Sequence, residues 1–277
     1  MKKDIILAGV GGQGILSMAY VIDEAAVESG FNIKQAEIHG MAQRGGAVYS
    51  HLRISSSPIA SDLIPKGSAD LIISIEPIEG LRYLSYLAPD GILITNSSPV
   101  RNIPNYPDME KVMGDILSLK KHIIIDAESL ARRAGSFRAQ NMVMLGASSA
   151  YLSLDRELLK KYIGELFSPR GEKIVELNLS AFAFGERIGR FYTLLLEEGV
   201  PPLSAFLLSS KIEAGEALTE SVDLWGKLLS SRAEEFVPIL KEFSGEISPR
   251  AEVPKKLLGL SLEKVDKKEE IFSILAG

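Results

Sequence analysis

The first candidate for ligand chemistry is a glycine loop near the N-terminus, Gly9-Val10-Gly11-Gly12-Gln13-Gly14. It follows an apolar run at 5–8 that predicts a buried strand, and it precedes an apolar segment at 15–22 that predicts the opening of a helix. This order is the context of the G-x-G-x-x-G dinucleotide fingerprint. Such glycines permit a tight turn, close approach of a ligand and packing of helix against strand, and the helix N-terminus attracts an anion. The pattern also fits a tight turn that binds nothing.

A second polar loop follows the next predicted strand, at 33–38. Its acidic residue stands about where a dinucleotide fold places the carboxylate that binds ribose hydroxyls. Its arginine precedes two glycines, so backbone N–H groups can form a nest beside a guanidinium, which is an anion site. Taken singly, each residue also fits a solvated loop, but together they fall at the carboxyl edge of the sheet. The candidates are Glu37, His39, Gln43, Arg44, Gly45 and Gly46.

Composition excludes several classes of function. The 277 residues are 46% hydrophobic and 24% charged, which is typical of a protein that buries a sizeable core. The net charge of −5 argues against a dedicated nucleic-acid binder. The chain has no cysteine, so it forms no disulfide, thiol nucleophile, zinc–thiolate site or cysteine-ligated iron–sulfur cluster. The three histidines, His39, His51 and His122, lack ligand spacing, and we expect no metal site.

The sequence also bears on location. It has no stretch of twenty apolar residues that could span a membrane, and its first residues lead into a strand without a signal-peptide pattern. We therefore expect a cytoplasmic protein that binds neither membranes nor nucleic acid.

Strand-like and helix-like segments alternate through the first half of the chain. This alternation predicts an α/β fold, a Rossmann-like three-layer sandwich with a mainly parallel sheet covered on both faces. One helix should end at the turn signal Pro89-Asp90-Gly91, and a proline-rich stretch at 100–107 should form a loop at the edge of the sheet. The predicted strands are 5–8, 33–38, 47–54, 69–75, 91–96 and 122–126, and the predicted helices are 12–29 and 76–88.

From residue 139 onward the pattern becomes helical. We place a domain boundary at residue 190, with a Rossmann-like domain at 1–190 and an all-α C-terminal extension at 191–277. Asp155 is an expected N-cap. The apolar stripe of the extension, which includes Leu224, Leu228, Phe236 and Leu240, predicts docking or self-association as a homo-oligomer. The predicted helices are 141–152, 155–167, 178–198, 203–218, 221–243 and a charged tail from Glu263.

The two N-terminal motifs, in this order and spacing, resemble a known family. Residues 9–15, and residues 37–46 followed by 48–53, look like the gamma-type subunits of the 2-oxoacid:ferredoxin oxidoreductases. They are most similar to the beta subunits of the indolepyruvate ferredoxin oxidoreductases. The segments 141–147 and 178–185 also match patterns of this family. The resemblance covers residues 1–190, and the extension has no counterpart in the short family members.

The resemblance implies a specific role. The family converts a 2-oxoacid and coenzyme A to acyl-CoA, carbon dioxide and reduced ferredoxin, with thiamine diphosphate and iron–sulfur clusters mainly on other subunits. It implies that this chain is the non-thiamine-binding subunit of the oxidoreductase, docks on a large subunit that carries both cofactors, and meets ferredoxin only indirectly. The expected substrates are arylpyruvates such as indolepyruvate. No catalytic residue is expected, and the isolated chain should be inactive.

The resemblance also implies that the glycine loop serves either subunit packing or the binding of an anionic ligand such as part of coenzyme A. The cofactor-binding candidates are Gly9, Gly11, Gly12, Gln13, Gly14, Glu37, His39, Gln43, Arg44, Gly45, Gly46 and Asn141.

Two alternatives stay open at this point. An NAD(P)-dependent oxidoreductase fits the glycine loop and Glu37, although no Tyr-x-x-x-Lys pair or other hydride-transfer set follows the sheet. A non-catalytic nucleotide-binding scaffold would use the C-terminal helices as its interaction module. Titration with NADH tests the first alternative, and co-purification with a thiamine- and cluster-containing partner tests the second.

Overall fold

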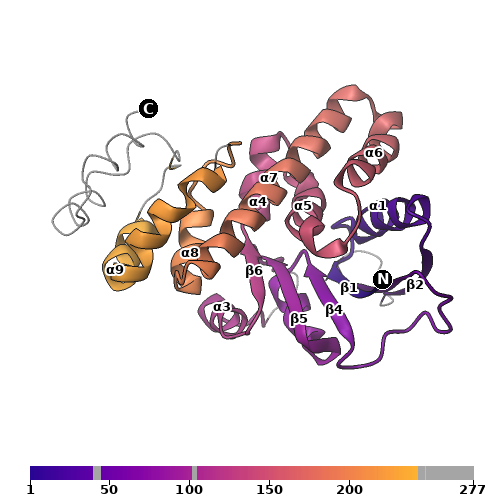
Figure 1. The fold of residues 1–277 in the computed structure, drawn as a ribbon, viewed down its shortest axis with the longest axis horizontal. Coiled ribbons are helices and arrows are strands. Elements are labelled where there is room, and N and C mark those ends of the chain that lie inside the picture. Colours follow the sequence, from indigo (N-terminus) through magenta and orange to yellow (C-terminus); the bar gives the residue numbers. More distant parts are fainter. Residues whose placement is uncertain (40–44, 102–104, 217, 243–246, 248–277) are drawn as a thin grey trace. The chain divides into compact units, whose positions relative to one another are not determined.

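A computed structural model describes residues 1–39, 45–101, 105–216, 218–242 and 247 of the chain (Figure 1). The chain divides into two compact units, 1–186 and 187–277, and the division falls within a single long helix.

The first unit is built on a six-stranded sheet with the order β2-β3-β1-β4-β5-β6. The pairs β1–β4, β4–β5 and β5–β6 are parallel, whereas β3 runs antiparallel to both β1 and β2. All strands except β3 therefore run in the same direction, which confirms the predicted α/β fold with a mainly parallel sheet. The strands are β1 (Lys2–Val10), β2 (Asn32–His39), β3 (Ala47–Ser55), β4 (Ala69–Ser74), β5 (Leu87–Asn96) and β6 (His122–Ile125).

Buried aliphatic side chains hold the sheet. Ile5, Ile72 and Ile94 are fully buried on adjacent parallel strands, and β6 is buried along its whole length. Parallel strands covered on both faces read as continuous apolar runs, which is why the sequence identified them. In Figure 1, α1 (Ile15–Glu28), α5 (Gln140–Leu152) and α6 (Arg156–Phe167) lie above the sheet, and α3 (Met109–Leu117) lies below β6.

The helix predicted to begin at Glu76-Pro77 forms, but its predicted end at Pro89-Asp90-Gly91 is wrong. Helix α2 (Pro77–Arg82) ends early, a 3₁₀ turn covers Leu84–Tyr86, and β5 already begins at Leu87. The turn-like residues lie inside β5, beside a register shift between β4 and β5. At this irregularity a side chain on Gly91 would lie 2.8 Å from the carbonyl oxygen of Ala69. Glycine here therefore allows close approach of two backbones within the sheet.

Two glycines allow α5 and α7 (Glu172–Glu197) to cross in direct contact. A Cβ atom on Gly146 would lie 2.0 Å from the carbonyl oxygen of Phe182, and one on Gly185 would lie 1.9 Å from that of Val143. The two helix backbones thus touch directly. This contact gives a physical reason for the glycines in segments 141–147 and 178–185.

Several helices differ from their predicted bounds. Helix α7 begins at Glu172, six residues before the predicted start. Helices α3 and α4 (Ala127–Ala134) were not predicted. The α6 helix is confirmed, and Asp155 caps it by accepting a hydrogen bond from the backbone N–H of Glu157 at 2.9 Å.

In the second unit, α8 (Pro202–Ser209) is shorter than the predicted helix 203–218. Beyond the helix, Ile212 forms a parallel bridge with Ile247, and Ile247 N–H donates to the carbonyl oxygen of Lys211 at 2.7 Å. Helix α9 (Val222–Glu242) is confirmed, with a non-helical residue, Arg232, at a kink. The predicted charged tail lies outside the described residues.

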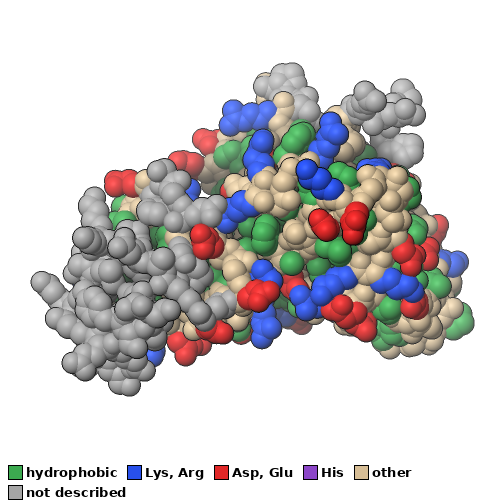
Figure 2. Space-filling model, turned by 90° about the horizontal axis from the view of Figure 1, so that it is seen from above, with side chains coloured by type: hydrophobic (Ala, Val, Ile, Leu, Met, Phe, Trp, Pro, Cys, Tyr) green, Lys and Arg blue, Asp and Glu red, His purple; other side chains and the backbone are tan. Residues whose placement is uncertain are grey.

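The apolar stripe of α9 is not exposed. Leu224, Leu228, Phe236 and Leu240 are all buried, so they do not supply the open surface that the docking hypothesis requires. Self-association through these helices stays a prediction. The face shown in Figure 2 carries Lys and Arg side chains interspersed with Asp and Glu. None of the helices in the described part of the chain has the length and apolar composition that a membrane crossing needs.

Candidate functional site

The glycine loop joins β1 to α1 through a turn closed by Gln13. The N–H of Gln13 donates to the carbonyl oxygen of Val10 at 3.1 Å, and its side-chain oxygen accepts the N–H of Val10 at 2.7 Å. Gly12 and Gly14 have φ angles of +98° and +81°, a region that favours glycine. A Cβ on Gly9 would lie 2.8 Å from the Gln13 side-chain oxygen. The loop is therefore built around glycine whether or not it holds a ligand.

The structure brings the end of the second polar loop to the glycine loop. Gly11 donates its N–H to the carbonyl oxygen of Gly46 at 2.8 Å, and Gly45 donates to the carbonyl oxygen of Gly11 at 3.4 Å. These bonds join the two motifs that the sequence singled out. The predicted site residues Gln43 and Arg44 lie outside the described residues.

Glu37 is exposed near the end of β2, at the edge of the sheet. In a dinucleotide fold the second strand lies directly beside the first, which brings its carboxylate to the ribose. Here β3 lies between β1 and β2. His39 is the last residue of β2 and pairs with Val48. The inserted strand makes the topology differ from the dinucleotide order at the position where the NAD(P) hypothesis needs the carboxylate.

Asn141 lies at the start of α5 and contacts the glycine loop. Its side-chain N–H donates to the carbonyl oxygen of Gly14 at 3.2 Å, and only 5% of the residue is exposed. A Cβ on Gly14 would lie 2.5 Å from this nitrogen. The structure thus places Asn141, one of the candidates taken from the family resemblance, against the glycine loop, and its role in ligand binding stays a prediction.

Side-chain amides, of which that of Asn96 is buried, tie the loop to the carboxyl ends of β4 and β5. The carbonyl oxygen of Ile75 accepts hydrogen bonds from the side chains of Gln13 at 3.3 Å and Asn96 at 3.1 Å. Asn96 also donates to the side-chain oxygen of Gln140 at 3.1 Å and accepts the N–H of Ala127 at 3.0 Å. Since Asn96 is fully buried, these bonds fix the glycine loop against the starts of α4 and α5.

A buried carboxyl group lies beside this network. Glu76 is 2% exposed, caps α2 by accepting the N–H of Glu79 at 2.9 Å, and accepts hydrogen bonds from Val100 N–H and the Tyr106 hydroxyl. Burial, followed by the hydrogen bond to Glu76, raises the pKa of Tyr106 well above its usual value. The hydroxyl therefore stays protonated and ties Tyr106 to the carboxylate that caps α2.

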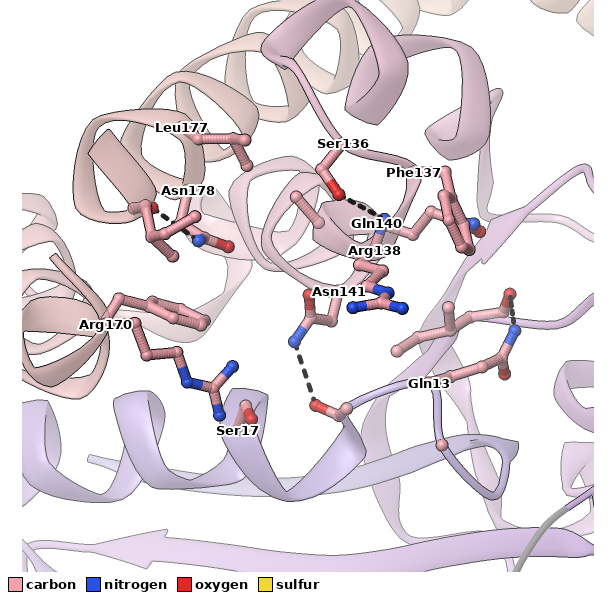
Figure 3. Close-up of a pocket in the computed structure, with 16 residues that line it drawn as sticks. Gln13, Ser17, Ser136, Phe137, Arg138, Gln140, Asn141, Arg170, Leu177 and Asn178 are labelled. Atoms are coloured by element: carbon pink, nitrogen blue, oxygen red, sulfur yellow. Dashed lines mark hydrogen bonds between the residues drawn. The ribbon is translucent and has the colours of Figure 1, made fainter. Parts of the chain in front are cut away.

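A cleft of about 700 Å³ opens beside the glycine loop (Figure 3). Its walls come from the first turn of α1, the start of α5, the 3₁₀ turns Phe137–Ala139 and Ser168–Arg170, and α7. Its described lining includes two arginines and no acidic side chain. The lining residues are Gly12, Gln13, Gly14, Ser17, Ile75, Ser136, Phe137, Arg138, Ala139, Gln140, Asn141, Phe167, Arg170, Ile174, Leu177 and Asn178.

The wall opposite the glycine loop carries no sequence motif. Arg138 and Arg170 follow short polar turns that carry no motif, and only the folded chain brings them to the first turn of α1. Asn178 belongs to the segment 178–185 that matches a pattern of the family. Within the described residues, no group of three or more acidic, histidine or cysteine side chains is placed to hold a metal ion.

Comparison with known proteins identifies the family. The model of the pyruvate ferredoxin/flavodoxin oxidoreductase family matches residues 4–187, a segment that contains the sheet, the glycine loop and the cleft. The chain belongs to this family. The expectation drawn from the two N-terminal motifs is confirmed, and residues beyond 187 lie outside the family match.

The chain is similar in sequence to indolepyruvate oxidoreductase subunits IorB. The subunit of Archaeoglobus fulgidus is 37% identical over 194 residues, which cover 67% of this chain and 94% of that subunit. The subunit of Thermococcus kodakarensis is 34% identical over 202 residues, covering 69% of this chain and 98% of that subunit.

Two solved structures of oxoacid:ferredoxin oxidoreductases share the fold. The gamma subunit of a keto/oxoacid ferredoxin oxidoreductase from Geobacter sulfurreducens PCA has a TM-score of 0.50 and 24% identity, covering 66% of this chain and 96% of that subunit. The 2-oxoglutarate:ferredoxin oxidoreductase of Magnetococcus marinus, with 2-oxoglutarate, coenzyme A and succinyl-CoA bound, has a TM-score of 0.56 and 22% identity. That match covers 68% of this chain but only 31% of the Magnetococcus chain.

Proposed function

We propose that the chain is the small, non-thiamine-binding subunit of a cytoplasmic 2-oxoacid:ferredoxin oxidoreductase that acts on indolepyruvate or related arylpyruvates. The observation that carries this proposal is the 34–37% identity to IorB subunits across nearly their whole length. The complex would convert the 2-oxoacid and coenzyme A to acyl-CoA, carbon dioxide and reduced ferredoxin.

The proposal assigns the redox cofactors to a larger partner subunit. The sequence has no cysteine, the usual ligand of iron–sulfur clusters, so the clusters belong on another chain. Thiamine diphosphate, when bound in the partner, supplies the chemistry that breaks the bond between the oxo carbon and the carboxylate. Ferredoxin then receives electrons from the partner and contacts this chain only indirectly.

The residues of this chain serve docking and ligand binding. Gly9, Gly11, Gly12 and Gly14 shape a loop whose backbone can approach a partner or an anion closely. Gln13 and Asn141 hold that loop in place through their side chains. Of the second motif, Gly45 and Gly46 bond to the glycine loop and would share its role, while Glu37, His39, Gln43 and Arg44 stay predicted binding residues.

Co-purification tests the subunit assignment. The tagged full chain, expressed in its native source, should capture a larger subunit, and the eluate should contain thiamine diphosphate and iron. A chain that elutes with neither cofactor would contradict the proposal. Titration of the same preparation with NADH distinguishes the dinucleotide alternative, because saturable NADH binding without a cofactor-bearing partner would favour that enzyme class.

A further inference from the structure

We propose that the outward face of α1 is the surface on which the larger subunit of the complex docks. This docking stripe consists of Leu16, Tyr20 and Val27, with Asp23 between the last two along the helix. The matching surface of the larger subunit would be apolar and would carry a lysine or arginine opposite Asp23. The choice of partner rests on the proposed function, whereas the place and the chemistry of the contact come from α1.

The docking stripe is apolar and open to solvent. Leu16, Tyr20 and Val27 are 54%, 38% and 58% exposed. Residues four and eleven positions apart on a helix point in nearly the same direction, so the three side chains form one row, roughly 16 Å long. The outward face of a surface helix is ordinarily polar. Of the six large apolar side chains that are exposed among the described residues, three lie in this one row.

The opposite face of α1 is already used by the fold. In Figure 1, α1 lies over β1 and β2, and on its inward side Met18 and Ile22 are fully buried. At the end of the helix, Glu28 accepts hydrogen bonds from Lys161 and Tyr162 of α6. None of the stripe residues lines the cleft beside the glycine loop. The docking stripe is therefore a separate surface that packing within the first unit leaves uncovered.

The charges of α1 indicate what kind of partner fits. Its 14 residues include three carboxylates, Asp23, Glu24 and Glu28, and no lysine, arginine or histidine. Glu28 pairs with Lys161, whereas no described residue forms an ion pair with Asp23 or Glu24. A basic partner complements this face. A second copy of this chain does not, because a two-fold contact through α1 would bring the carboxylates of both copies together.

Asp23 supplies an independent reason for a cation in the partner. One of its carboxylate oxygens is buried and makes no hydrogen bond with any described residue, and burial raises its pKa. The main cost of an ion pair at an interface is the removal of both charges from water. For Asp23 much of that cost already arises when the free chain folds. A lysine or arginine of the partner can therefore pair with Asp23 at a smaller desolvation cost than with an exposed carboxylate.

Binding of the captured large subunit to the full chain, measured by biolayer interferometry at pH 8, tests the docking stripe. Tyr20→Ser and Val27→Ser should each weaken binding at least about tenfold, because apolar contact area is lost. Asp23→Asn should weaken binding by a similar factor, although it removes an unpaired charge and should stabilise the free chain. These opposite effects on affinity and stability separate a docking role of Asp23 from a structural one.

Two matched controls lie outside α1. Leu63→Ser removes an apolar side chain that is 52% exposed, and Asp115→Asn removes an exposed carboxylate from α3. Both variants should bind the large subunit as the wild type does. Circular dichroism verifies that each variant is folded before its affinity is compared.

The inference is overturned if folded Tyr20→Ser and Val27→Ser bind the large subunit as tightly as the wild type, or if Asp23→Asn leaves the affinity unchanged. A homodimer in sedimentation that Val27→Ser dissociates would assign the stripe to a second copy and would likewise overturn it. These results are distinguishable from failure of the proposed function, in which the wild-type chain captures no cofactor-bearing subunit at all.

Discussion

Asn141 donates a hydrogen bond to the carbonyl oxygen of Gly14 at 3.2 Å and thereby joins the start of α5 to a loop 127 positions earlier in the chain. The contact leaves no room for a side chain, since a Cβ on Gly14 would lie 2.5 Å from the Asn141 nitrogen. The last glycine of the loop is thus required by its φ angle and by Asn141 together. This requirement holds whether or not an anion binds.

Gly14→Ala should lower the free energy of unfolding by at least about 1–2 kcal/mol, because alanine is strained at a φ of +81° and its methyl group would contact Asn141. Urea unfolding of the isolated chain measures the change. Gly164→Ala in α6 is the control. No atom lies within 4 Å of its added Cβ, and it should stabilise the chain by about 0.5–1 kcal/mol. Equal midpoints for Gly14→Ala and the wild type would show that the loop relaxes freely.

Gly185→Ala should destabilise the first unit by about 1–3 kcal/mol or more, because its methyl group would overlap the carbonyl oxygen of Val143 and force α5 and α7 apart. Thermal unfolding reports the effect. The matched variant Gly114→Ala lies in α3, where the added Cβ meets nothing within 4 Å. An unchanged melting temperature for Gly185→Ala would contradict the direct backbone contact.

Asp23 in α1 should make the chain less stable at alkaline pH. One of its carboxylate oxygens is buried and makes no hydrogen bond with any described residue, and burial, with a smaller contribution from Glu24, raises the pKa of Asp23 to about 7. Because the folded-state pKa lies above the unfolded value, the protonated form favours folding at low pH. That stability is lost as the pH rises from about 4 through 7.

Asp23→Asn should therefore raise the unfolding free energy at pH 8, by at most about 4 kcal/mol, with little change at pH 4. Chemical denaturation at both pH values measures it, and Glu24→Gln on the same helix should have a smaller effect in the same direction. A gain of equal size at pH 4 and pH 8 would mean that the charge of Asp23 is not responsible.

His51 should make the chain less stable at acidic pH. It is 2% exposed, its Nδ1 accepts the N–H of Ile64 at 3.1 Å, and burial lowers its pKa. Since the folded-state pKa of His51 lies below the unfolded value, the unfolded chain binds a proton first as the pH falls. Stability that is present above about pH 6.5 is therefore lost at lower pH. His51→Asn, which can keep the acceptor, should reduce this loss between pH 7 and pH 5. An unchanged pH slope would exclude His51 as its source.

The sequence predicted best those elements whose apolar residues repeat without interruption. The strands β1, β4 and β6 are continuous aliphatic runs, and buried parallel strands require that pattern. Helix α3 was missed although Asp108 supplies a capping side chain and Val112 and Ile116 form one apolar face. The turn-forming residues at 100–107, directly before it, indicate a loop, and the helix itself has only nine residues, so its periodic pattern is short.

In the candidate site, too, only the parts that depend on local sequence could be predicted. The glycine loop is local, so its backbone requirements can be inferred from residues 9–14 alone. The wall that contains Arg138, Arg170 and Asn178 is assembled from three segments of the fold, and no local spacing reveals it. The order of strands is likewise a matter of long-range pairing, so the position of β3 between β1 and β2 could not be inferred from Glu37.

The most direct test of the subunit assignment is reconstitution. Reduction of viologen dye, dependent on indolepyruvate and coenzyme A, should be measured with this chain alone, with the captured large subunit alone and with the two combined. We expect no turnover from this chain alone and full turnover only from the combination. Robust turnover by this chain alone, or none by the combined and cofactor-loaded subunits with any 2-oxoacid, would contradict the assignment.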